Sequence, residues 1–199
     1  MVTTITNITQ VFNETQKFPE MDSYFISKLF AEWTGLGGQT ASVATPTVAN
    51  VLNLFQTMME EMDEDRVPQV GRILYVTPAV NRMLREAEAI GRSIELRNRT
   101  TSITTMITDI DNVRLEMVPS NLMRTLYNFD EGARPATGSR QINMLLGHNS
   151  CVAAPVKYVS SRLDVPSALS KDKWVYYERA YEDVFVLKHK AQGLRFNIT

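Results

Sequence analysis

One stretch decides the fold of this chain: Val67-Pro68-Gln69-Val70-Gly71-Arg72-Ile73-Leu74-Tyr75-Val76-Thr77-Pro78, at residues 67–78. Its centre, residues 73–76, is a continuous apolar run, which is typical of a strand buried on both faces. Thr77-Pro78 then predicts a helix start, because the hydroxyl caps free N–H groups and proline at the first helical position loses no hydrogen bond. Apolar residues at helical spacing continue to Ile90, before Gly91. The stretch therefore predicts a buried strand followed directly by a helix.

A second helix is predicted upstream of this strand. Thr45-Pro46 repeats the hydroxyl-then-proline pattern of a helix start. The apolar residues that follow at helical spacing are Val48, Val51, Leu52, Phe55, Met58, Met59 and Met62. This methionine-rich face indicates core packing, with an adaptable binding groove as the alternative. Helix, buried strand and helix together predict an α/β core of about fifty residues.

The upstream helix is predicted to end in a cluster of acidic residues. Its members are Glu60, Glu61, Asp63, Glu64 and Asp65. Negative charge is unfavourable near a helix C-terminus, so local helix stability does not explain the cluster. The cluster is either a solvated face or a docking patch for a basic surface of another subunit. We therefore take these five residues as candidate subunit-contact residues.

The N-terminal part of the chain predicts a polar segment and one helix. Residues 1–16 are rich in Thr, Asn and Gln, with apolar residues three to four apart. They indicate a short amphipathic segment or an arm that orders only against a neighbour. Phe18-Pro19-Glu20 opens a helix predicted over Met21 to Trp33, and the glycines at 35–38 end it in a loop.

The C-terminal half predicts mainly strands. Residues 113–117 alternate apolar and charged side chains before Pro119, which is typical of a half-buried strand. Further strands are predicted at 142–146, 174–177, 184–187 and 194–198, with a loop at 163–173 and a turn at 188–193. Helices come first and strands last, with one α/β unit between them. This order predicts an α+β fold.

Composition excludes several classes of function. The 199 residues include 21 basic and 22 acidic side chains, for a net charge of -1, and lack the basic excess typical of phosphate binding to nucleic acid. One cysteine and two histidines provide neither an intrachain disulfide nor a recognisable zinc cluster, so we expect no metal and no other cofactor. No signal peptide or membrane-spanning run is evident, which predicts folding in a reducing cytoplasm.

Catalytic chemistry has one candidate in this sequence. His148 and Cys151 lie close together, and a thiol nucleophile with a histidine base is one interpretation. A strand-end histidine beside a small, half-buried cysteine is the favoured one. The strand-to-helix turn at residues 76–78 has no glycine, which argues against a phosphate-binding loop. We expect no enzyme and no catalytic residue, and keep a small α/β enzyme using Cys151 and His148 as an alternative.

Two stretches carry packing residues in a characteristic order. The first stretch begins with an acidic helix. At residues 67–78 this helix is followed, in order, by Val-Pro, Gly-Arg, a strand and the Thr-Pro that starts a second helix. The second is the C-terminal run, with its parts at residues 142–146, 174–178, 181–187 and 193–198, preceded by Val118-Pro119-Ser120. Over Phe18 to Ile198 this order resembles the major capsid proteins of tailed bacteriophages, which have the Hong Kong 97-type capsid fold.

The resemblance implies an axial domain near the symmetry axes and a peripheral domain with a long helix and a narrow sheet. It assigns residues 1–44 to an N-terminal segment and the peripheral-domain helix. Residues 45–150 belong mainly to the axial domain, with its α/β core, and residues 151–199 to the returning strands of the peripheral domain. The chain is too short to hold in addition the N-terminal arm and extended loop that family members carry upstream.

As a function, the resemblance implies a structural subunit of an icosahedral phage or prophage capsid. Such a subunit self-assembles into hexamers and pentamers and encloses double-stranded DNA. The expected partners are copies of itself, scaffold and portal proteins, and DNA through weak non-specific contact, with no membrane. Its expected place is the virion, and the bacterial host cytoplasm during assembly. The near alternative is the shell protein of an encapsulin-type bacterial nanocompartment, which has the same fold.

Overall fold

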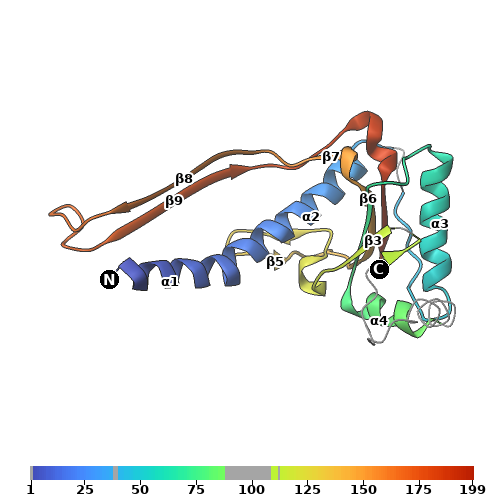
Figure 1. Ribbon diagram of the computed structural model, residues 1–199, viewed down its shortest axis with the longest axis horizontal. Helices are drawn as coiled ribbons and strands as arrows, with labels where there is room; N and C mark the ends of the chain where they lie inside the picture. Colours follow the sequence, from blue (N-terminus) through green and yellow to red (C-terminus); the bar gives the residue numbers. More distant parts are fainter. Residues whose placement is uncertain (1, 38–39, 88–108, 112) are drawn as a thin grey trace, which may run out of the picture.

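The computed structural model describes residues 2–37, 40–87, 109–111 and 113–199 (Figure 1). These residues form a body, in which helices pack on a sheet, and a projecting arm made of a long helix and a two-stranded hairpin. The fold is therefore α+β, as the order of helices and strands predicted.

The elements have the following bounds. The α-helices are α1 (Val2–Phe12), α2 (Phe18–Gly35), α3 (Val51–Glu64) and α4 (Pro78–Glu86), the π-helix is η1 (Asn13–Lys17), and the 3-10 helices are η2 (Ser120–Leu122), η3 (Asn149–Cys151) and η4 (Lys188–Gly193). The strands are β1 (Arg72–Val76), β2 (Asp109–Ile110), β3 (Val113–Met117), β4 (Tyr127–Asn128), β5 (Arg134–Pro135), β6 (Ile142–His148), β7 (Val152–Ala153), β8 (Val156–Asp164), β9 (Val175–Glu182), β10 (Phe185–Val186) and β11 (Leu194–Ile198).

Five strands form the sheet of the body, in the order β11-β6-β1-β3-β2. The central strand β1 runs parallel to β3 and antiparallel to β6. Its Leu74 and Val76 are fully buried on one face, and Tyr75 packs against the core on the other. The prediction of a strand covered on both faces is confirmed.

Helices α3 and α4 cover one face of the sheet (Figure 1). The buried side of α3 consists of Val51, Phe55, Met58 and Met62, so its methionine-rich face is core and not an open groove. The Thr77 hydroxyl accepts the Val80 N–H at 3.4 Å at the start of α4, which confirms the predicted cap. The helix was predicted to continue to Ile90, but α4 ends at Glu86 and Ala87 already has extended backbone. The rest of the predicted continuation, to Ile90 and Gly91, lies outside the described residues.

Helix α2 covers the other face. Trp33, fully buried, lies 4.8 Å from the Phe196 ring of β11, measured between ring centroids, and its indole N–H donates to the Ala191 carbonyl at 3.1 Å. Ile26 and Leu29 are buried on the same side of α2. One sheet therefore separates two apolar cores that lie on its opposite faces.

The predicted helix start at Thr45-Pro46 is wrong, because α3 begins at Val51. The Asn50 side chain accepts the Thr47 N–H at 2.7 Å and donates to the Thr45 carbonyl at 3.1 Å. A short amide side chain that bonds the nearby backbone stabilises a turn in competition with a helix. This turn delays the helix by about one helical turn.

Helix α2 begins at Phe18, as the helix start predicted at Phe18-Pro19-Glu20 required, but it continues the helical structure before it, which runs from Val2 to Gly35. Proline lacks the N–H that a continuous α-helix needs, and it usually kinks or ends one. Here a π-helical turn, η1, comes just before it, and the Phe18 N–H bonds the Asn13 carbonyl five residues back. This wider turn accommodates the proline, as π-bulges in α-helices do.

Three predictions for the C-terminal part need correction. Residues 188–193 are not a hairpin turn: they form η4, which joins β10, paired with β7, to β11, paired with β6. Strand β8 was not predicted, and β9 is longer than the strand predicted at 174–177. The predicted loop at 163–173 begins inside β8, so only its part after Asp164 is a loop, in the turn that joins β8 to β9.

Candidate functional site

Two surfaces carry the residues of functional interest: the acidic end of α3 and the projecting arm. At the first, Arg72 of β1 is buried, with 2% of its surface exposed. Its guanidinium donates to Asp63 Oδ1 at 2.6 Å and to the backbone carbonyls of Val67 and Pro68 at 2.5 and 3.0 Å. One member of the acidic cluster is therefore bound within the chain.

A second arginine, Arg195 of β11, binds two more members of the cluster. Its Nε donates to Glu61 Oε2 at 2.8 Å, and its Nη2 donates to Asp65. Nη1 donates to the carbonyls of Gln192 and Leu194 at 2.7 and 3.0 Å. Arg195 is 8% exposed, so it lies inside the body with all of these acceptors around it.

The two arginines explain why acidic residues gather at the end of α3. A helix C-terminus disfavours negative charge, and a buried cation that reaches it offsets that cost. Of the five candidate contact residues, Glu60 and Glu64 are left without an ion pair among the residues that the structure describes. The part of the cluster that remains available to another molecule is these two carboxylates.

Sequence reasoning missed both arginines. The signal was present: each stands inside an apolar strand sequence, Gly71-Arg72-Ile73 and Leu194-Arg195-Phe196. A permanently charged side chain in such a position is rarely buried without a partner.

The geometry around Cys151 and His148 does not assemble a catalytic pair. Nδ1 of His148 lies 2.9 Å from the Ser150 hydroxyl and Nε2 lies 3.0 Å from the Val70 carbonyl, so both ring nitrogens are already engaged. Cys151 is 2% exposed, and burial raises the pKa of its thiol above the ordinary 9.0. A nucleophilic cysteine needs the opposite shift, toward the thiolate.

In residues 2–37, 40–87, 109–111 and 113–199, no group of three or more His, Cys, Asp or Glu side chains is placed to hold a metal ion. Within the same ranges, no helix has the length and apolar character needed to cross a bilayer.

Polar contacts hold the hairpin against the helical part of the arm. Lys17 pairs with Glu178 of β9, and this bond holds the pKa of the Glu178 carboxyl below its ordinary 4.5. The Tyr24 hydroxyl donates to Asp183 Oδ1 at 3.2 Å, and the Val184 N–H donates to the same oxygen at 2.8 Å. These contacts fix where the hairpin leaves the helix.

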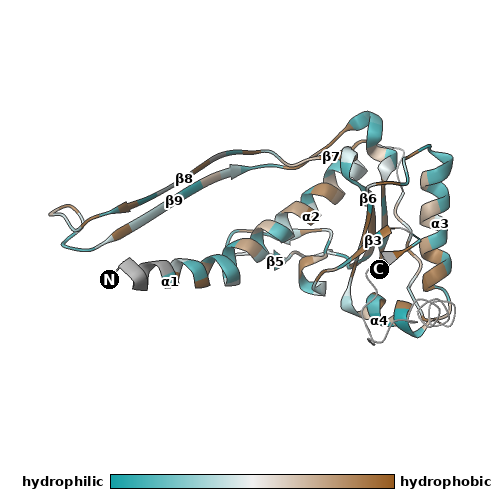
Figure 2. Cartoon of the chain, viewed as in Figure 1, coloured by the Kyte–Doolittle hydropathy of each residue, from teal (hydrophilic) through white to brown (hydrophobic). Residues whose placement is uncertain are grey.

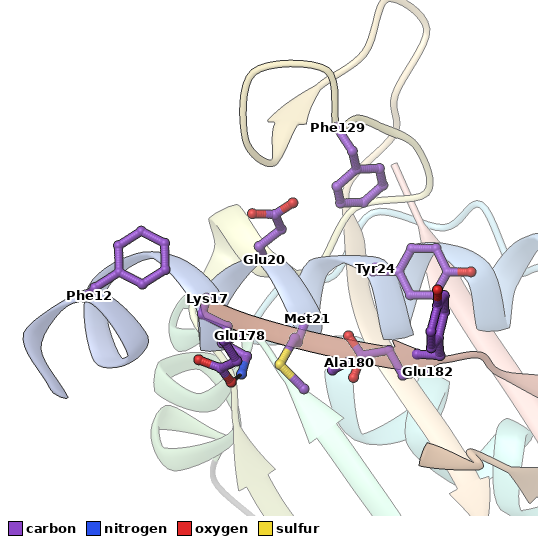
Figure 3. Close-up of a pocket in the computed structure, with 10 residues that line it drawn as sticks. Phe12, Lys17, Glu20, Met21, Tyr24, Phe129, Glu178, Ala180 and Glu182 are labelled. Carbon is purple, nitrogen blue, oxygen red and sulfur yellow. Dashed lines mark hydrogen bonds and ion pairs between the residues drawn. The ribbon is translucent and has the colours of Figure 1, made fainter. Parts of the chain in front are cut away.

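A groove of about 540 Å³ opens between the helix and the hairpin (Figure 3). Apolar side chains line it, among them Phe12, Met21 and Tyr24 from the helix. Phe129 reaches in from the loop after β4 and meets Tyr24 edge to face, with 5.7 Å between ring centroids. The carboxylates of Glu20 and Glu182 also line the groove, in addition to the paired Glu178.

Along its length, inside the groove and beyond it, the arm exposes many apolar side chains. Figure 2 shows apolar residues interspersed with polar ones along its helix and hairpin. On the helix these are Ile8, Val11, Phe12 and Phe18, and on the hairpin Val156, Val159, Leu163, Val165, Leu169, Val175, Tyr176, Tyr177 and Tyr181. Within the described chain, β8 and β9 pair only with each other, so both outer edges of the hairpin keep free backbone groups. The sequence alone did not reveal this surface, because β8 was not predicted.

These features define a class of protein: an α+β body with a closed double core, and an arm whose apolar surface is left open. No protein-family model matches the chain, and no curated protein matches it. A solved structure from Mycobacterium phage Che8 has the same fold, with a TM-score of 0.56 and 16% sequence identity. The match covers 98% of this chain and 61% of that one, so the chain spans less than two thirds of the phage protein.

Proposed function

We propose that this chain is a structural subunit of a phage or prophage capsid with the Hong Kong 97-type fold, and that it works by assembling with copies of itself. The observation that carries the proposal is the arm, a long helix and a long hairpin that project from the body with their apolar side chains exposed. The shared fold with a phage protein supports it.

The arm does not have the energetics of an isolated structure. A two-stranded hairpin is marginally stable by itself in water, and β8–β9 faces the helix mainly through the half of β9 nearer the body, from Glu178 to Glu182. Exposed strands with free edges and apolar faces invite pairing with other chains, and proteins normally shorten, charge or cover them. An arm of this length is therefore expected to be covered in the working protein, and identical copies are the simplest cover.

The two parts of the molecule fit the two domains that the capsid fold requires. In this proposal α1, η1, α2 and the β8–β9 hairpin form the peripheral domain, with its long helix and narrow sheet. The five-stranded sheet with α3 and α4 forms the axial domain. Strand β11 crosses from the C-terminal segment into that sheet, so residues 151–199 serve both domains.

The related function of a nanocompartment shell needs the same surfaces and differs in what is enclosed. A cargo gene beside this one would favour it, and portal and terminase genes would favour the capsid.

We also propose that the chain is not an enzyme, which the engaged imidazole of His148 and the buried thiol of Cys151 support. Scaffold and portal proteins, and weak contact with DNA, remain proposed partners, and the virion the proposed location.

Electron microscopy and analytical ultracentrifugation of the full-length protein test this function. We expect capsomer rings or closed shells that form as concentration rises. A protein that stays strictly monomeric at high concentration, with its fold intact by circular dichroism, contradicts the proposal.

A further inference from the structure

The tip of the hairpin is an ordered turn that presents Leu169 as its most exposed apolar side chain. Leu169 is 99% exposed at the turn between β8 and β9. The Ser167 N–H donates to Ser170 Oγ at 2.9 Å, and the Ser170 hydroxyl donates to the Ser167 carbonyl at 3.1 Å. Lys171 and Asp172 both have positive φ, at 52° and 59°, a conformation that costs free energy in residues other than glycine. The turn is therefore ordered by its own hydrogen bonds, and it keeps the Leu169 side chain almost fully exposed to solvent.

The charge of the tip is positive next to this leucine. Lys171 and Lys173 are exposed, and within the described chain neither takes part in an ion pair. Asp172 between them is the one acid of the turn. The tip therefore combines the exposed apolar side chain of Leu169 with a small excess of positive charge.

The groove between the helix and the hairpin has the complementary character, apolar walls with negative charge. Its walls are apolar, from Phe12, Met21 and Tyr24, and Glu20 and Glu182 supply carboxylates (Figure 3). These two carboxylates have no ion pair among the described residues, whereas Glu178 beside them is already bound by Lys17. The groove can bury an apolar side chain and pair lysines around it.

The tip of a chain cannot fill the groove of the same chain. The ladder of β8 and β9 is continuous from Ser161↔Glu178, beside the groove, to Asp164↔Val175, and the tip lies beyond it (Figure 1). A paired ladder is extended, so it holds the tip away from the groove along the arm. The occupant must come from another molecule.

We propose that the hairpin tip of one copy docks into the helix–hairpin groove of a second copy, with Leu169 in the apolar part and Lys171 and Lys173 against Glu20 and Glu182. This inference rests on the proposed self-assembly and names the surfaces that carry it. The contact is heterologous, because tip and groove are different surfaces, and each copy both gives a tip and receives one. Heterologous contacts close into rings when the rotation between copies allows it.

Disulfide trapping between two variants tests this contact. Leu169→Cys and an affinity-tagged Glu20→Cys are prepared separately, mixed at equal concentration and oxidised. Both positions are exposed, and the native Cys151 is 2% exposed and does not compete. The matched control replaces Glu20→Cys by a tagged Val70→Cys, at a body position that is 81% exposed. We expect at least about ten times more tagged cross-linked dimer with Glu20→Cys than with Val70→Cys, because docking raises the effective concentration of the two thiols.

Charge reversal gives an independent readout. Lys171→Glu with Lys173→Glu, or Glu20→Lys with Glu182→Lys, is expected to lower association measured by sedimentation, and the four changes together to restore it. Equal trapping at residues 20 and 70, or no restoration by the combined reversal, overturns the docking proposal. If copies still associate in that case, only the tip contact is refuted; if they do not associate at any concentration, the shell function is refuted as well.

Discussion

Replacing the buried Arg195 by methionine should destabilise the body far more than removing an exposed charge. The side chain is 10% exposed and binds two carboxylates, Glu61 and Asp65. It also satisfies the carbonyls of Gln192 and Leu194. Methionine keeps the apolar stem and loses every one of these hydrogen bonds, which isolates the electrostatic contribution.

The size of the stability loss depends on whether water can reach the two carboxylates once Arg195 has been replaced. Removing one member of a buried ion pair typically costs about 3 to 5 kcal/mol. Here the Glu61 side chain is 53% exposed and that of Asp65 34%, so water can rehydrate both carboxylates and reduce the cost. Against this, two negative charges at the C-terminus of α3 lose their counter-charge. We expect a loss of about 2 to 4 kcal/mol in the free energy of unfolding.

Urea unfolding followed by circular dichroism measures this loss. With a slope of about 2 kcal/mol/M, the midpoint should fall by about 1 to 2 M. The control is Arg114→Met, whose side chain is 71% exposed and pairs with Glu116 on the same strand, so that its midpoint should barely move. Adding Glu61→Gln to Arg195→Met should recover part of the loss, because it removes an uncompensated charge. A midpoint for Arg195→Met within about 0.3 M of the parent would refute the reasoning.

Three other predictions follow from the same contacts. Glu60→Lys with Glu64→Lys should leave the unfolding midpoint unchanged, since neither residue has an ion pair in the described chain, and should weaken association in sedimentation if the patch docks another subunit; a lowered midpoint would contradict this. Because the pKa of Glu178 is lowered in the folded protein, its ion pair with Lys17 stabilises the arm above the ordinary pKa of 4.5, and this stabilisation is lost as pH falls through the folded pKa. Protease cleavage of the arm should therefore rise in acid, and Lys17→Met should remove that pH dependence. Because the pKa of the Cys151 thiol is raised, the buried thiol form stabilises the fold below the ordinary pKa of 9.0, and this stabilisation is lost as pH rises through the folded pKa. The thiol should therefore react with Ellman's reagent at pH 8 only after unfolding. Rapid reaction of the folded protein would instead support the enzyme alternative.

Local signals made the centre of the fold predictable. The apolar run of β1 and the Thr77-Pro78 start of α4 each act over a few residues, and both are present in the structure. Thr45-Pro46 has the same local pattern and starts no helix, because the side chain of Asn50 bonds the backbone around it. A cap motif therefore predicts a helix only where no nearby side chain offers the backbone another partner.

Features that depend on distant partners were not predictable. Leu194 and Phe196 alternate with Arg195 in β11, and a strand with one buried face would leave such an arginine exposed; instead the acidic end of α3 covers Arg195. That cover comes from residues more than a hundred positions away in the chain. Strand β8 lacked a recognisable pattern because its described side chains are exposed or half-buried on both faces, and a period of two appears only when one face is buried.

The contrast between the body and the arm is the strongest physical argument for assembly. In the body, even unusual residues are satisfied internally: buried arginines find carboxylates and carbonyls, and each face of the sheet has its helix. The same chain leaves the arm with an ordered turn around a leucine that is 99% exposed and with strand edges that have no partner among the described residues. A sequence able to close its core this completely has no need to expose an arm for the sake of its own folding. The open surface is therefore best explained by a contact that a single chain does not contain.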